Sequence, residues 1–323
     1  MSRRVLRTGV AALAAAASLG VASCSGVTYA ETPVPTTSAT SSSGGGGSTT
    51  TPVQCSNATQ SYSPLSSVPP TSQITDQRLR RIIDRGHLIV GVSADTYRFG
   101  ARNPFNGQIE GFDIDIAREV AKSLLGSASK LQPRVITTAD RIPLLEKGEV
   151  DMVVRIMTMT CDRWKDIAFS SEYYRSGQKL LVSKASTAVT LADMKGKRVC
   201  APAGSTSLTK LRTFQGVIPV VAANHTGCLV LFQQGKVDGI TGDDTVLAGL
   251  AAQDPYAVVT KAAPITAEPY GIGFNKADVY FVRYVNALLA EMRSDGRWKA
   301  IYNRWLASTL GPAPAPPTPV YGR

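Results

Sequence analysis

Histidine is scarce in this sequence, and acidic residues are outnumbered by basic ones. The 323 residues include two histidines, 24 acidic residues, 35 basic residues and five cysteines. No two cysteines form a C-x-x-C pair, the spacing typical of structural zinc sites. Neither His87 nor His225 accompanies a recognisable Ser or Cys nucleophile pattern. We therefore expect no metal site, no cofactor and no catalytic triad.

The positive charge lacks the pattern that accompanies nucleic-acid binding. The formal net charge is +11, but no run of Lys and Arg interleaved with aromatic residues occurs. The charge instead favours anionic ligands or anionic surfaces. With 43% hydrophobic residues the chain can form a proper core, and its length suits about two domains of roughly 150 residues.

The N-terminal segment has the pattern of an export signal. Three arginines within residues 3–7 precede an apolar run over residues 10–21, which is too short to span a bilayer. Residues 21–24, Val-Ala-Ser-Cys, resemble a bacterial lipobox. This resemblance implies a signal peptide over residues 1–23, lipidation of Cys24 with fatty acids such as palmitate, and anchoring on the extracytoplasmic face of the cell membrane. An ordinary signal peptide is the alternative, and residues 2–4 also resemble a twin-arginine signal, which leaves the export route open.

Both ends of the exported chain are poor in periodic apolar residues. Residues 24–75 are rich in Ser, Thr, Pro and Gly, which predicts a disordered tether. Residues 311–323 form a Pro-rich tail that we expect to be loose. Outside the cytoplasm, the even set of Cys55, Cys161, Cys200 and Cys228 favours disulfides, and four cysteines allow three connectivities.

Helical and strand patterns alternate from residue 76 onward. Asp76 is a plausible N-cap for a helix whose apolar face includes Leu79 and Ile82, and Gly86 is its expected end. A strand pattern follows over residues 87–92, and helical spacing returns over residues 112–124. This alternation predicts an α/β fold with parallel strands.

An internal repeat indicates two similar lobes. Residues 144–151, Leu-Leu-Glu-Lys-Gly-Glu-Val-Asp, are echoed by residues 231–238, Leu-Phe-Gln-Gln-Gly-Lys-Val-Asp. Each copy has the pattern of a helix end, a glycine cap and a strand that opens with Val-Asp.

Several motifs together resemble the extracellular solute-binding proteins of polar amino-acid ABC transporters. The resemblance covers about residues 78–310. It is carried by the order and spacing of Gly111-Phe112-Asp113, Thr158-Met159-Thr160 with Arg163, Phe169-Ser170, Tyr173-Tyr174, Leu191-Ala192-Asp193, Gly204-Ser205-Thr206, Val237-Asp238 and Tyr270-Gly271-Ile272.

The resemblance implies a two-lobed periplasmic-binding-protein-like fold with the ligand in the interlobe cleft. Lobe 1 would comprise residues 76–182 and 269–310, and lobe 2 residues 183–268. Two crossing strands near residues 178–182 and 268–274 would form the hinge. This layout implies disulfides Cys200–Cys228 within lobe 2 and Cys55–Cys161 between tether and lobe 1.

The same resemblance assigns the groups that hold the backbone of a free amino acid. Arg163 matches an arginine that binds the α-carboxylate, a task suited to its planar guanidinium. Thr158 and Thr206, with Ser205 and the backbone amides of that loop, would complete the carboxylate site. Asp244 would accept the ammonium, although the adjacent Asp243 fits the pattern nearly as well.

Ligand specificity is expected from residues 95–103. Tyr97 or Phe99 could cover the aliphatic carbons of the ligand, and Arg102, or less plausibly Arg98, could face its side chain. An arginine there favours aspartate or glutamate over asparagine or glutamine. By strand alternation, Arg155 should point away from Thr158.

The sequence therefore predicts a monomeric, membrane-anchored receptor and no catalysis. Ligand would close the hinge, and an ABC-transporter permease would read the closed form. A sensor with a signalling partner is one alternative. An enzyme on the same fold, a dehydratase or a lyase, is another, but it needs a general acid for which no carboxylate is suitably placed.

Overall fold

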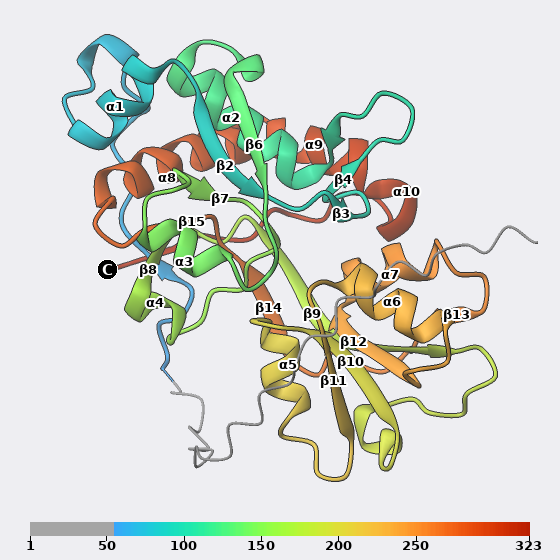
Figure 1. Cartoon of the computed structure of the whole chain (residues 1–323). Helices are drawn as coiled ribbons and strands as arrows, with labels where there is room; N and C mark the ends of the chain where they lie inside the picture. The colour runs from blue at the N-terminus through green and yellow to red at the C-terminus, as the bar shows by residue number, and fades with distance from the viewer. Residues whose placement is uncertain (1–54) are drawn as a thin grey trace, which may run out of the picture. The chain divides into compact units, whose positions relative to one another are not determined.

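Helices and strands alternate along residues 55–323, the part of the chain that the computed structural model describes (Figure 1). Residues 1–54, including the expected signal peptide and Cys24, lie outside this range. The helices are α1 (Gln77–Arg85), α2 (Phe112–Leu125), α3 (Arg141–Glu146), α4 (Arg163–Asp166), α5 (Thr206–Leu211), α6 (His225–Gln233), α7 (Asp244–Ala251), α8 (Val279–Ser294), α9 (Arg297–Trp305) and α10 (Ala307–Leu310), with 3₁₀ turns η1 (Thr71–Gln73), η2 (Ala128–Lys130) and η3 (Leu191–Met194).

Two mixed sheets form the centres of two lobes. The first has strand order β6-β2-β7-β15-β8 and the second β11-β10-β12-β9-β13. In each, the first three strands are parallel and the remaining pairs antiparallel. Their bounds are β2 (Leu88–Val92), β6 (Leu131–Val135), β7 (Met152–Val153), β8 (Ile167–Phe169), β9 (Tyr174–Ser183), β10 (Arg198–Pro202), β11 (Ile218–Ala222), β12 (Gly239–Asp243), β13 (Ala257–Val259) and β15 (Gly273–Asn275). A small sheet joins β3 (Asp95–Thr96), β4 (Gly100–Arg102) and β5 (Ile109–Glu110).

The internal repeat corresponds to one structural unit used twice. Gly148 and Gly235 both adopt left-handed backbone, with φ of 67° and 65°, after α3 and α6. In each copy the aspartate that follows bonds to a central strand: Asp151 accepts from the Ile89 amide at 2.8 Å, and Asp238 from the Arg198 amide at 2.7 Å. The two junctions therefore fix the parallel strands of both lobes in the same way.

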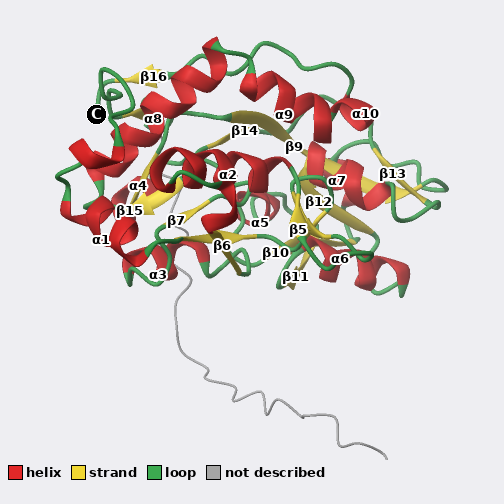
Figure 2. Cartoon of the chain, turned by 90° about the horizontal axis from the view of Figure 1, so that it is seen from above, coloured by secondary structure: helices red, strands yellow, loops and turns green. Residues whose placement is uncertain are grey.

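Two antiparallel strands connect the lobes. The long strand β9 belongs to the second sheet, and its first half pairs with β14 (Ala267–Tyr270), from Gly177 with Ala267 to Tyr174 with Tyr270. Figures 1 and 2 show β9 and β14 running together between the two groups of elements. The crossing on β14 overlaps the one expected near residues 268–274, but the crossing on β9 lies at residues 174–177 and not at the expected 178–182, which pair with β12 of lobe 2.

Helix α1 begins and ends where the sequence predicts. The Asp76 side chain accepts a hydrogen bond from the Leu79 amide at 3.0 Å, and α1 ends at Gly86 in left-handed backbone. Leu79 and Ile82 are fully buried in the core of lobe 1. Capping and apolar spacing were thus sufficient to predict this helix.

Residues 55–75 differ from the expected disordered tether. Ile74 is fully buried, and Tyr62, Leu65 and Val68 pack against the core of lobe 1. The Ser61 hydroxyl donates to the Phe169 carbonyl at 2.8 Å. The few apolar residues of this segment pack against lobe 1, a contact between residues distant in sequence that local composition does not reveal.

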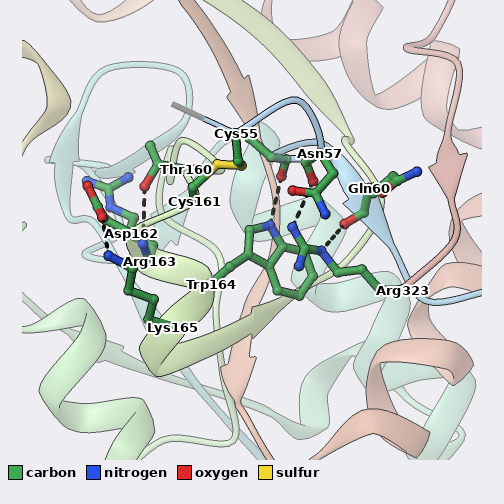
Figure 3. The surroundings of a disulfide bond; sticks show 11 residues. Cys55, Asn57, Gln60, Thr160, Cys161, Asp162, Arg163, Trp164, Lys165 and Arg323 are labelled. Atoms are coloured by element: carbon green, nitrogen blue, oxygen red, sulfur yellow. Dashed lines mark hydrogen bonds and ion pairs between the residues drawn. A yellow bond between two sulfur atoms is a disulfide. The ribbon is translucent and has the colours of Figure 1, made fainter. Parts of the chain in front are cut away.

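The tail is also ordered. Strand β16 (Val320–Tyr321) pairs in parallel with β1 (Gln60–Ser61), so the two ends of the described chain meet on lobe 1. The Arg323 guanidinium donates to the Gln60 and Asn57 carbonyls, both at 2.7 Å, and lies 3.9 Å from the centre of the Trp164 ring (Figure 3). Backbone pairing and a cation–π contact hold the tail on lobe 1, although its sequence has no apolar periodicity.

Both disulfides that the family resemblance implied are present. Cys55 is joined to Cys161 beside Trp164 (Figure 3). Cys200 is joined to Cys228 in the core of lobe 2. Among residues 55–323, no helix is both long and apolar enough to cross a membrane.

Candidate functional site

A small polar cavity lies where the two lobes meet. Its volume is about 20 Å³, room for roughly one water molecule. An amino acid is several times larger, so binding one here requires the lobes to move apart at β9 and β14. The lining residues come from both lobes and are Thr138, Arg141, Arg155, Ile156, Thr158, Ser205, Thr206, Ser207, His225 and Asp243.

Arg163 lies at the edge of this cavity and reaches the opposite lobe. Its side chain is buried, and its guanidinium donates to the Thr158 carbonyl at 2.6 Å and to the Gly204 carbonyl at 3.0 Å. Burial lowers the pKa of Arg163, while the nearby carboxylates of Glu268 and Asp243 act in the opposite sense. The Arg163 guanidinium of lobe 1 is therefore in contact with the loop that follows β10 in lobe 2. The carboxylate site predicted from the sequence requires this contact, because it uses groups from both.

The predicted hydroxyls of Thr158 and Thr206 converge on one carboxylate oxygen. Glu268 Oε2 accepts from Thr158 Oγ1 at 2.6 Å and from Thr206 Oγ1 at 2.8 Å. Its other oxygen accepts from the Thr266 hydroxyl at 2.6 Å, and Glu268 is only 2% exposed. Glu268 is the first residue of the expected hinge strand over residues 268–274, but the sequence predicted no role for its side chain.

Ser205 has a structural task in addition to lining the cavity. Its hydroxyl accepts from the Leu208 amide at 3.0 Å and donates to the Pro202 carbonyl at 2.7 Å, which caps α5. The cap positions Thr206, the first residue of α5, toward Glu268.

Arg155 faces the cavity, contrary to the alternation argument. Strand β7 ends at Val153, and Ile156 has a φ of 39°, so regular alternation stops before Arg155 is reached. The guanidinium of Arg155 donates to the Thr138 hydroxyl at 2.8 Å and to the Ile136 carbonyl at 3.0 Å. Arg155 therefore lines the same cavity as Thr158.

Arg141 is a further cavity residue that sequence analysis missed. It opens α3, is 3% exposed, and donates from Nη2 to the Gly204 carbonyl at 3.2 Å, the same acceptor that Arg163 uses. Burial lowers the pKa of Arg141 well below its usual value, and the positive charges of Arg163 and Arg155 lower it further. A signal was available in its position, directly after the helix N-cap Asp140 and three residues after Thr138.

The two adjacent aspartates point into different regions. Asp243 lines the interlobe cavity and accepts from the Tyr270 hydroxyl at 2.5 Å. Burial raises the pKa of Asp243 to about 8, and the charge of Glu268 adds to this effect. Asp244 instead accepts from Ser176 at 2.6 Å and lines a separate cavity on the other side of the hinge. The structure thus brings Asp243, and not Asp244, to Thr158 and Thr206.

Tyr97 and Arg102 lie away from the interlobe cavity. Tyr97 is 40% exposed, with the Arg98 guanidinium over its ring, and Arg98 also donates to the Trp305 carbonyl. Arg102 donates to the Gly107 carbonyl within its own loop at 2.8 Å. The cationic groups that line the cavity are instead Arg141 and Arg155.

His225 lines the cavity at the start of α6. Burial lowers the pKa of His225 to about 4, and the charge of Arg155 contributes, so its imidazole is neutral at pH 7. Within residues 55–323, no group of three or more His, Cys, Asp or Glu side chains is arranged to hold a metal ion.

The family of the chain follows from a comparison with known proteins. The family model of bacterial extracellular solute-binding proteins, family 3, matches residues 88–308. The chain belongs to this family. The matched residues include both sheets, the hinge strands and every residue that lines the interlobe cavity. As a family 3 protein, the chain is an extracellular solute-binding receptor and not an enzyme.

Individual family members match over most of their own lengths. The ABC transporter glutamine-binding protein GlnH of Bacillus subtilis is 38% identical over 71% of this chain and 84% of its own length. The glutamate-binding protein GluB of Corynebacterium glutamicum is 32% identical over 71% and 80%. Among solved structures, holo ArgBP from T. maritima matches with a TM-score of 0.63 and 30% identity, covering 70% of this chain and 98% of that one. The two-lobed α/β fold is thereby confirmed.

Proposed function

We propose that the chain is a lipid-anchored extracytoplasmic receptor that closes on a polar amino acid, preferably glutamate or aspartate, and presents it to an ABC importer. The supporting observation is that Arg141 and Arg155 line one interlobe cavity, while Arg163 donates to the same Gly204 carbonyl as Arg141. Three buried guanidiniums repel one another, and an anionic ligand relieves that repulsion while satisfying their donors.

The ligand backbone would be held between the lobes. Arg163 and Arg141 share the Gly204 carbonyl as an acceptor, so separation of the lobes frees both guanidiniums for a carboxylate. The hydroxyls of Thr158 and Thr206, together with the amide groups at the start of α5, would complete the α-carboxylate site. Asp243 would accept the ammonium, because it is the buried carboxylate that lines the cavity.

The ligand side chain would extend toward Arg155. This guanidinium and the Thr138 hydroxyl lie next to each other, and His225 lines the same cavity as a neutral donor or acceptor. A carboxylate in this position can form a bidentate ion pair with the guanidinium, which a neutral amide cannot. GluB supports this choice, whereas GlnH supports the amide, so glutamine is the main competitor.

Calorimetric titration of the purified chain with glutamate, aspartate, glutamine and asparagine tests the proposal. We expect glutamate or aspartate to bind at least about tenfold more tightly than its amide, a difference of about 1.4 kcal/mol. If glutamine bound as tightly as glutamate or more tightly, the preference for an acidic ligand would be wrong, but the assignment as an amino-acid receptor would stand. Failure of all twenty amino acids to bind below about 1 mM would overturn the receptor assignment itself.

The membrane anchor and the partner require separate tests. Mass spectrometry of the mature N-terminus should find a diacylglyceryl-modified and acylated Cys24, and a free N-terminus elsewhere would contradict it. Cross-linking in membranes should capture an ABC permease, whereas capture of a signalling receptor would favour a sensor.

A further inference from the structure

A second cavity lies on the opposite side of the hinge from the interlobe site. Its volume is about 760 Å³, within the range of small-molecule sites. It is lined by hinge residues, by the start of α7, by α9 and by the C-terminal tail. The lining residues are Tyr174, Arg175, Asp244, Thr245, Trp298, Tyr302, Leu310, Pro314, Ala315, Pro317, Thr318 and Val320.

Three aromatic side chains form one wall of this cavity. The rings of Tyr174 and Tyr302 lie 6.3 Å apart at an angle of 21°, and those of Trp298 and Tyr302 lie 5.5 Å apart. The Trp298 indole is fixed by a 2.7 Å hydrogen bond to the Tyr173 carbonyl. The faces of electron-rich aromatic rings are the surfaces that attract organic cations.

Asp244 supplies a negative charge beside these rings. Its carboxylate receives one hydrogen bond, from the Ser176 hydroxyl, and no ion pair with it occurs within residues 55–323. Arg175 also lines the cavity, but its guanidinium is held by Glu172 at 2.6 and 2.5 Å, which offsets its charge. Of the two charged residues that line the cavity, Arg175 therefore has a partner of opposite charge and Asp244 has none among residues 55–323.

The tail forms the remaining wall. Residues 314–320 return from α10 toward lobe 1, where β16 pairs with β1 and Arg323 is fixed next to Trp164. Figure 2 shows the chain leading back from α10 to β16. Proline restricts the backbone of this segment, so the wall is preorganised. Residues 309–323 lie beyond the family match, so most of this wall is outside the part of the chain that the family model describes.

From these observations we propose that the cavity behind the hinge binds a small organic cation, a quaternary or methylated ammonium compound, between Asp244, the aromatic wall and the tail. The cation would gain cation–π contacts with Tyr174, Tyr302 and Trp298 and an ionic contact with Asp244. This site is separate from the interlobe cavity, although Asp243 and Asp244 are adjacent in the chain.

Titration with choline tests the proposal, with dimethylbutanol, its uncharged carbon isostere, as the matched ligand. Choline should bind with a Kd below about 1 mM and should change the fluorescence of Trp298, while dimethylbutanol should bind at least about tenfold more weakly. Equal binding of the two compounds, or no saturation by choline up to about 50 mM, would overturn the proposal.

Variants locate the bound cation. Asp244→Asn should weaken choline binding about tenfold or more, whereas Asp84→Asn, the same change on the exposed face of α1, should not. Tyr302→Leu should weaken it, and Tyr302→Phe, which keeps the ring, should restore it. Asp243→Asn should leave it unchanged, and strong loss in that variant would place the cation in the interlobe cavity and refute the second site.

Discussion

The hydroxyl of Thr206, at the start of α5 in lobe 2, donates to Glu268 on the hinge strand β14 at 2.8 Å. The same carboxylate oxygen accepts from Thr158 of lobe 1, so one hinge carboxylate holds both hydroxyls that the sequence assigns to the ligand. A hydroxyl has only one proton to donate. A ligand carboxylate must therefore compete with Glu268 for these two donors.

Replacement of that hinge carboxylate by an amide should tighten amino-acid binding. In Glu268→Gln the amide group can donate to the threonine hydroxyls, which frees their protons for the ligand. The change also removes a negative charge near Arg163 and Asp243. We expect Kd to fall about three- to tenfold, about 0.7–1.4 kcal/mol.

Calorimetry at pH 7 measures this effect, and Glu146→Gln, an exposed change on α3, is the matched control. Weaker binding in Glu268→Gln with unchanged thermal stability would show that Glu268 supports the ligand and does not compete with it.

The two adjacent aspartates should differ in their effect on amino-acid binding. Asp243→Asn leaves the ligand ammonium with a neutral partner in a buried site, and should cost about 2–5 kcal/mol of binding free energy. Asp244→Asn, one residue along, should change amino-acid Kd less than twofold because its side chain lines the other cavity. If Asp244→Asn weakened amino-acid binding more than Asp243→Asn did, Asp244 and not Asp243 would be the residue that contacts the ligand ammonium.

Amino-acid binding should release a proton at neutral pH. Burial raises the pKa of Asp243 to about 8, so its carboxyl is mostly protonated at pH 7. Contact with an ammonium favours the carboxylate and lowers that pKa, so affinity should rise with pH between 6 and 8 by up to about tenfold per pH unit. Calorimetry in phosphate and in Tris at pH 7 should give different observed enthalpies, and identical enthalpies would contradict the linkage.

The first disulfide should stabilise lobe 1 and the N-terminal segment together. Cys55 and Cys161 close a span of 106 residues, and Cys161 lies two residues before Arg163. Cys55→Ala combined with Cys161→Ala should lower the free energy of unfolding by about 2–5 kcal/mol. Denaturant titration with intrinsic tryptophan fluorescence measures it, and the wild type in reductant is the control. An unchanged midpoint would mean that the segment is held by packing alone.

The sequence predicted those features that local chemistry determines. Asp76 and Gly86 bound α1 through capping, and the repeated glycine and aspartate before β7 and β12 mark equivalent junctions. The family motifs placed Arg163, Thr158 and Thr206 near one another, and the structure brings them together.

The remaining site residues depend on contacts that are distant in sequence or on irregular backbone. The side chain of Arg155 was predicted to point away from Thr158, which is wrong because β7 ends at Val153 and Ile156 has a positive φ. The tail appeared loose because its partner strand, β1, lies about 260 residues away along the chain. Asp243 and Asp244 are one residue apart at the end of β12, where a family match alone does not fix which carboxylate faces the cleft.

A crystal structure of the purified chain grown with L-glutamate tests the central claim most directly. The account predicts one glutamate between the lobes, its α-carboxylate on Arg163 and the start of α5, its ammonium on Asp243 and its side chain toward Arg155. A glutamate bound outside the interlobe cleft, or held there without contact to Arg163, would contradict it.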